Sequence, residues 1–275
     1  MRTTMKNLLY QLTLFVLLIS STVFAQSPEE IMSRMMSQYS NSLDGIETMM
    51  TVSTMDGFMA TDEPDTTYYR KVTLEDGTQV LEDVNGDTPG ANYWNLKENF
   101  ETIAENATYE GTETVDGREA HVIFIEDVSA LYGQTMGEVE DGTQGEPQSG
   151  RFYVDVDDYV PLRMSFDVEF DGEYSGAVDV NMKDYRSVDG IQMAFLTEIA
   201  MEGISDQFSA EELAEARQGM RELREQLENA SGMQKRIMER AIEPQLERME
   251  KILEEGSMTM SITILEAQTN VSIPE

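Results

Sequence analysis

Apolar and polar residues alternate along much of the chain. This period of two is the pattern of strands that have one buried face and one solvent-exposed face. The clearest run is residues 162–170, in which five apolar residues are separated by polar or charged ones. The same alternation recurs at 122–124, 152–156, 178–182, 193–201, where Thr197 interrupts it, and 258–264. Because short turns separate most of these runs, the pattern predicts an antiparallel meander.

The N-terminal part begins with a helical period. Ser27 and Glu30 form a capping box, and Gly45 supplies a stop after apolar residues at helical spacing. Three strands are then predicted at 47–55, 67–74 and 79–84, separated by Gly, Pro and Asp, and a second helix is predicted at 92–105.

Residues 206–256 have the sequence pattern of helices, unlike the predicted strands on either side. A second capping box at 209–212 opens one predicted helix, the bend falls at 229–232, and a second helix follows in which Pro244 introduces a kink. A predicted strand stands before and after this segment. We therefore interpret 206–256 as a helical hairpin inserted into a single domain.

The first 25 residues combine a basic start, an apolar run and a small residue, Ala25, before the polar Gln26. This is typical of a cleaved secretory signal, so residues 26–275 are expected to form the exported domain. The chain contains no Cys, which excludes disulfides, thiol nucleophiles and thiolate metal sites.

The chain is strongly acidic. It carries 53 Asp and Glu against 19 Lys and Arg, a formal net charge of −34. Such a chain should be repelled by nucleic acid, so no nucleic-acid partner is expected. The acids are spread along the sequence rather than gathered in a tail, which favours a protein adapted to a salty, screening environment over a calcium store.

Asp155, Asp157 and Asp158 raise the question of a metal loop, a catalytic pair or a turn. An EF-hand loop that started at Asp155 would need Gly at its sixth position and Glu at its twelfth, where this chain has Val160 and Phe166. We therefore interpret the cluster as the wet side of one strand and the turn to the next. No metal site and no cofactor are predicted.

Signatures of other enzymes are missing from the sequence. His121 is the only histidine, so a zinc site of several histidines cannot form, and there is no G-x-S-x-G, G-x-x-x-x-G-K or G-x-G-x-x-G motif. We place His121 at a strand edge or on a sheet face. A hydrolase that uses scattered carboxylates is an open alternative, because in so acidic a chain any two acids can meet.

Three strings carry a family resemblance: GREAHVIFIE at 117–126, FYVDVDDYVPLRM at 152–164 and DYRSVDGIQMAF at 184–195. They resemble the strand, turn and hairpin segments of the bacterial outer-membrane lipoprotein-sorting family, the periplasmic carriers related to LolA and LolB. The resemblance covers most of the chain outside 206–256. It implies an α+β fold in which helices cover the concave face of an unclosed antiparallel β-barrel.

The resemblance also implies a function: a non-enzymatic periplasmic carrier that binds lipoprotein acyl chains or related lipids. The apolar strand positions would line the cavity, and two helices would form a lid. The cavity candidates are Met164, Phe166, Val168, Phe170, Val178, Val180, Met182, Met193, Phe195, Ile199 and Met201. The lid candidates are Ile31, Met35, Tyr39, Trp94 and Phe100. The alternative at each position is an ordinary packed core.

The chain departs from the family pattern in several places. It lacks a basic residue between Asp44 and Tyr69, where the carriers have an arginine on an early strand. The insert 206–256 is not part of the simple carrier, and the tail after Ile273 is short. A second hypothesis is therefore a sensor or interaction protein of the same fold, which binds a protein partner through the insert.

Overall fold

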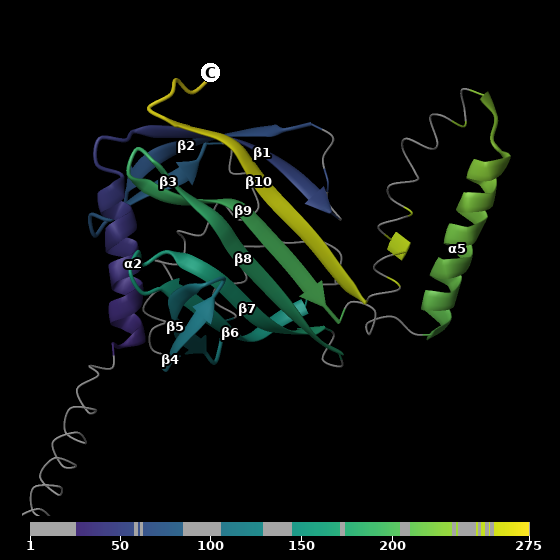
Figure 1. Ribbon diagram of the computed structural model, residues 1–275, viewed down its shortest axis with the longest axis horizontal. Coiled ribbons are helices and arrows are strands. Elements are labelled where there is room, and N and C mark those ends of the chain that lie inside the picture. The colour runs from purple at the N-terminus through teal and green to yellow at the C-terminus, as the bar shows by residue number, and fades with distance from the viewer. Residues whose placement is uncertain are drawn as a thin grey trace, which may run out of the picture.

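Ten strands form one antiparallel sheet in the order β3-β2-β1-β10-β9-β8-β7-β6-β5-β4 (Figure 1). The computed structural model describes residues 26–57, 60, 63–84, 106–128, 145–170, 174–203, 210–232, 235, 246, 249, 250, 253 and 256–274. The strands are β1 (Thr48–Gly57), β2 (Asp65–Thr73), β3 (Gln79–Asp83), β4 (Ala107–Val115), β5 (Arg118–Ile125), β6 (Gly145–Asp155), β7 (Pro161–Phe170), β8 (Tyr174–Val188), β9 (Ile191–Glu202) and β10 (Ser257–Thr269). β3 and β4 do not pair with each other, so the sheet is open.

The alternating runs of the sequence coincide with β5 to β10, and the three early predicted strands coincide with β1 to β3 within two residues at each end. β4 was not predicted. Its sequence, ATYEGTETV, holds few apolar residues, and its register shifts between Tyr109 and Gly111, where the glycine has a φ of 116°. An edge strand that is mostly solvent-exposed and contains a bulge lacks the regular apolar–polar alternation by which strands are recognised in a sequence.

Helix α2 (Pro28–Ser42) matches the first predicted helix. The Ser27 hydroxyl accepts from the backbone N–H of Glu30 at 3.1 Å, which satisfies one of the free N–H groups of the first turn. The helix contacts both edge strands, β3 and β4, as well as the central β9, so it spans the open side of the curved sheet (Figure 1). The predicted helix at 92–105 and the signal segment 1–25 lie outside the described residues.

Two hydrophobic clusters join α2 to the sheet. The larger contains Ile31, Met32, Met35 and Met36 of the helix with side chains of β5 to β8, among them Ile123, Phe152, Met164, Val180 and Met182. The smaller contains Leu43 and Ile46, which follow the helix, with Met49 of β1, Leu81 of β3 and Ile191 of β9. The helix is therefore fixed at both of its ends by apolar contacts.

The chain leaves the sheet after Glu202 of β9 and returns to it at Ser257 of β10. These two residues pair with each other, so residues 203–256 are inserted at a single point of the sheet. Helix α5 (Ala210–Asn229) lies within this segment and matches the first helix predicted there. Arg217 donates to the Leu253 carbonyl at 3.1 Å, and Met220, Leu227 and Leu246 are buried. In the described ranges no helix is both long enough and apolar enough to cross a membrane.

Candidate ligand-binding cavity

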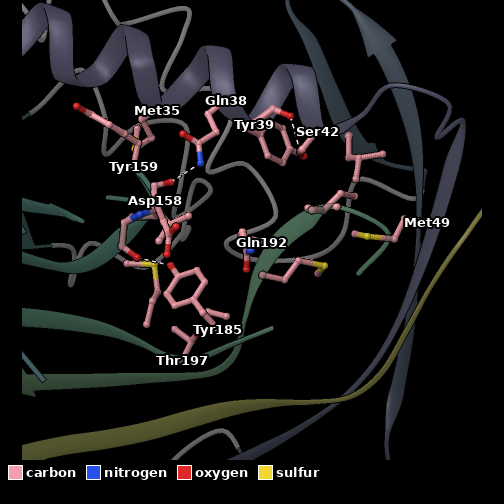
Figure 2. A pocket seen from close by; sticks show the side chains of 18 of the residues that line it. Met35, Gln38, Tyr39, Ser42, Met49, Asp158, Tyr159, Tyr185, Gln192 and Thr197 are labelled. Carbon is pink, nitrogen blue, oxygen red and sulfur yellow. Dashed lines mark hydrogen bonds between the residues drawn. The ribbon is translucent and has the colours of Figure 1, made fainter. Parts of the chain in front are cut away.

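A cavity of about 250 Å³ lies between the C-terminal half of α2 and the sheet (Figure 2). Met35, Gln38, Tyr39 and Ser42 extend from the helix, and Tyr185, Gln192 and Thr197 lie opposite them. The remaining walls are Met49, Tyr69 and Leu81 from β1 to β3, Phe152, the turn residues 158–160, Pro161, Met164, Met182, Gly190, Ile191, Met193 and Ala194. The cavity thus joins segments that are far apart in the sequence.

Buried apolar side chains form the depth of this cavity. Met35, Met49, Met164 and Met182 are each no more than 8% exposed, and Met193 is half-buried. Methionine is unbranched and polarisable, so such a wall can adapt its shape to a flexible apolar guest. The position of the cavity follows from helix packing: the first two turns of α2 fill the sheet face, and the later turns leave space above it.

Exposed polar groups form the mouth. Gln38 donates to the Asp158 carbonyl at 2.7 Å, and Gln192 lies on the opposite side. Within the wall, the Tyr185 hydroxyl donates to the Pro161 carbonyl. Burial raises the pKa of the Tyr39 hydroxyl, and Tyr69 is shifted in the same direction for the same reason. The cavity is therefore apolar inside, with hydrogen-bonding groups at its edge that include the amides of Gln38 and Gln192 and the side chain of Asp158.

The sequence-predicted residues divide into three groups. Met164, Met182 and Met193, with Met35 and Tyr39 of the helix, line the cavity. Ile31, Phe166, Val178, Val180 and Ile199 pack in the larger cluster instead, whereas Val168 and Phe195 are buried elsewhere and Met201 is half-buried. Trp94, Phe100 and the side chain of Phe170 lie outside the described part of the chain.

Sequence reasoning missed the contribution of the first three strands. Met49, Tyr69 and Leu81 stand on segments that were predicted as strands but not as cavity walls. They face the cavity because the sheet curves and α2 contacts both of its edges. Apolar positions on these strands are a signal in the sequence, but the curvature that brings them opposite β9 is a long-range property.

The aspartate cluster is a turn, as predicted, but Asp155 is not on a wet surface. Its side chain is buried, and its carboxylate accepts from Arg118 Nε at 2.8 Å and from the backbone N–H groups of Asp157 and Asp158 at 2.9 and 2.6 Å. The strand alternation placed Asp155 at the surface, and that assignment was wrong because the turn folds back over it. Within the described residues, no cluster of His, Asp and Glu side chains is arranged to hold a metal ion.

His121 lies on β5 between β4 and β6, on the sheet face rather than at an edge, and is 5% exposed. Its Nδ1 is 3.2 Å from the Tyr109 hydroxyl, and its ring lies 6.0 Å from that of Tyr159. Burial lowers the pKa of His121, an effect that nearby Glu119 partly opposes and Arg34 reinforces. The imidazole is therefore a neutral core group at physiological pH.

No protein-family model matches the chain, and no match is found among curated proteins. The chain is similar to the crystal structure of an outer membrane lipoprotein-sorting protein domain from Vibrio parahaemolyticus, with 9% identity over 90% of this chain and 94% of that one and a TM-score of 0.38. A DUF1329 family protein from Desulfovibrio piger matches with 11% identity, coverage of 90% and 93%, and a TM-score of 0.40. A LolA superfamily protein from Nitrosomonas europaea matches with 8% identity, coverage of 87% and 94%, and a TM-score of 0.31. The descriptions of the first and third of these structures name the family that the three sequence strings resemble.

Proposed function

We propose that this protein is a periplasmic, non-enzymatic carrier that binds the acyl chains of lipoproteins, or of related lipids, in the cavity beneath α2. The observation that carries the proposal is the cavity itself, with its methionine-rich depth and polar mouth. In this proposal residues 1–25 direct export, and residues 26–275 form one carrier domain interrupted by the insert 206–256. Helix α2 serves as the lid.

The energetics favour an alkyl chain as the guest. Each methylene that moves from water into an apolar wall contributes about 0.8 kcal/mol, and an empty apolar cavity leaves its lining side chains without contacts on one side. The cavity volume of about 250 Å³ is slightly below the roughly 300–1,000 Å³ of typical ligand pockets. Binding of one chain would therefore be accompanied by rotation of the methionine side chains or a small outward shift of α2.

The test is native mass spectrometry of the purified exported chain, followed by solvent extraction and lipid analysis. Thr197→Trp, which places an indole in the cavity wall, should abolish acyl binding. Thr263→Trp is the matched control. Thr263 pairs with Leu196, the neighbour of Thr197, so it lies on the opposite face of the sheet. It is half-buried, as Thr197 is, and should leave binding unchanged.

Two results would contradict the carrier function. One is a ligand-free protein that binds no lipid or lipopeptide offered to it. The other is equal loss of binding in both tryptophan variants while each retains the native thermal transition, because a cavity ligand must distinguish the two faces.

A second candidate function is favoured by the surface of the insert. Leu223 on α5 is 39% exposed and Met249 is 44% exposed, so the insert presents large apolar side chains to solvent. In this reading the insert binds a protein partner and the cavity only stabilises the fold. Replacing 203–256 by Asn-Gly, a two-residue turn suited to joining antiparallel strands, would remove partner binding and leave lipid binding intact.

A further inference from the structure

The described residues that line the cavity offer no cation to an acidic head group. Among the described residues that line it, none is Lys, Arg or His, and the one carboxylate is that of Asp158. An ionised phosphate or carboxylate that entered this mouth would lose water without gaining a counter-charge, and burying an unpaired charge is strongly unfavourable.

Two arginines that bond to residues of the cavity lining, Arg118 and Arg34, already have carboxylate partners. Arg118 donates to the Asp158 carboxylate at 2.7 Å, and Arg34 donates to the Tyr159 hydroxyl at 3.0 Å and to Glu30 at 2.6 Å. An anionic head group that approached either arginine would have to compete with a carboxylate that is already paired with it. Both are therefore components of the rim rather than free anion receptors.

Apart from Asp158, the polar side chains at the mouth are neutral hydrogen-bonding groups. Gln38 keeps its amide oxygen as an acceptor after its Nε2 donates to the turn, and Gln192 is exposed with no hydrogen-bond partner among the described residues. Ser42 lies one turn beyond Gln38 on α2, and its hydroxyl donates to the Tyr39 carbonyl at 2.6 Å. Amide and hydroxyl groups pair with amides, esters and alcohols without requiring charge.

We infer that the ligand is an acyl chain with an uncharged, hydrogen-bonding head group, such as an amide or ester, and that the mouth discriminates against chains with phosphate or carboxylate heads. This inference rests on the proposed carrier function and defines its ligand class. Gln38 and Gln192 determine the specificity for the head group. Their side chains are neutral, whereas a carrier of anionic lipids would need a cation at these positions.

The experiment compares three probes that share one alkyl chain: tetradecanamide, tetradecanoate and tetradecyl phosphate. Each competes, below its micellar concentration, with a fluorescent neutral acyl amide for the purified exported chain. We expect the amide to bind at least about tenfold more tightly than either anion, which corresponds to about 1.4 kcal/mol. The preference should persist from about 0.15 M to about 1 M NaCl, because the Debye length shortens from ~8 to ~3 Å while local desolvation remains.

Two substitutions distinguish an effect of the mouth on binding from an effect of the protein's overall charge. Gln192→Lys places a cation at the mouth and should strengthen binding of the two anions several-fold with little effect on the amide. Ser33→Lys is the matched control. It adds the same charge to an exposed position of α2 that is five residues, or about 140° of helical rotation, from Gln38. It should leave all three affinities unchanged.

The outcomes are distinct. Equal or tighter binding of the anions by the wild-type chain would refute head-group selection and leave the carrier function standing. A preference that disappears at high salt would also refute it, because the discrimination would then come from the overall charge of −34. Binding of none of the three probes would refute the carrier function and this inference together.

Discussion

Removal of the Asp155 carboxylate is the sharpest test of how the β6–β7 turn is held. The carboxylate accepts two backbone N–H groups, those of Asp157 and Asp158, and the Nε of Arg118. Its side chain is 4% exposed, whereas that of Arg118 is 32% exposed. In Asp155→Ala the partly buried donors lose their acceptor, but the guanidinium can be partly rehydrated and keeps its bond to Asp158.

The magnitude follows from these contacts. Breaking a buried charged pair costs about 3–5 kcal/mol, and the partial exposure of Arg118 places this case at the lower end. We expect a loss of about 3 kcal/mol in the free energy of unfolding. For a domain of this size that corresponds to a decrease in Tm of roughly 6–12 °C. Asp155→Asn keeps an oxygen acceptor for the backbone N–H groups and should lose about half as much.

Thermal unfolding monitored by circular dichroism, with denaturant unfolding as a second measure, gives the result. Asp157→Ala is the control, because this neighbour is exposed and its side chain has no partner among the described residues. It should change stability by less than about 0.5 kcal/mol. A decrease in Tm for Asp155→Ala no larger than that of the control would refute the idea that the Asp155 carboxylate stabilises the β6–β7 turn. Stabilisation of the wild type by Ca²⁺ that is lost in Asp155→Ala would restore the metal-loop interpretation.

Three further predictions concern the helix, the histidine and the overall charge. Ser27→Ala removes the N-cap of α2 and should cost about 1 kcal/mol, or roughly 2–4 °C in Tm, while Ser37→Ala on the exposed face of the same helix should not destabilise it. Because burial holds the folded-state pKa of His121 below its ordinary value of about 6.5, the unfolded chain binds the proton more tightly, and stability should fall as the pH drops below that value. The difference in Tm between wild type and His121→Phe should therefore narrow or reverse between pH 7.5 and pH 5; a constant difference would show that this imidazole does not titrate on unfolding. Raising NaCl from about 0.1 M to about 1 M should increase Tm, because screening weakens repulsion among the acids; an unchanged or lower Tm would argue against adaptation to salt.

The strands could be predicted from the sequence because alternation is a local consequence of burying one face. Residues 162–170 were predicted as a strand, and β7 runs from Pro161 to Phe170. The same rule failed at Asp155, where backbone N–H groups and Arg118 cover a position that the alternation assigned to water. A side chain that folds back on its own turn is buried by neighbours in sequence, and the period of two contains no information about them.

The cavity could be predicted only in part, and the reason is the placement of α2 across the sheet. Met164 and Met182 pack in the larger cluster and also border the cavity. Phe166, Val180 and Ile199 have the same apolar alternation and pack in that cluster, but they do not line the cavity. Which of these positions border empty space depends on where the helix lies across the sheet. That placement is set by contacts with both edge strands, and a single-strand pattern cannot specify it.

The position of the insert indicates that its role is separable from that of the cavity. The cavity takes its β9 residues from Ile191 to Thr197, whereas the insert leaves the sheet after Glu202, where β9 pairs with the start of β10. At ~3.3 Å per residue, Thr197 lies about 17 Å along the strand from that point, and Ile191 about twice as far. A lid must touch what it covers, and α2 already borders the cavity along Met35 to Ser42. The insert leaves the sheet away from the cavity, so the proposed carrier function and the proposed docking function would use different residues.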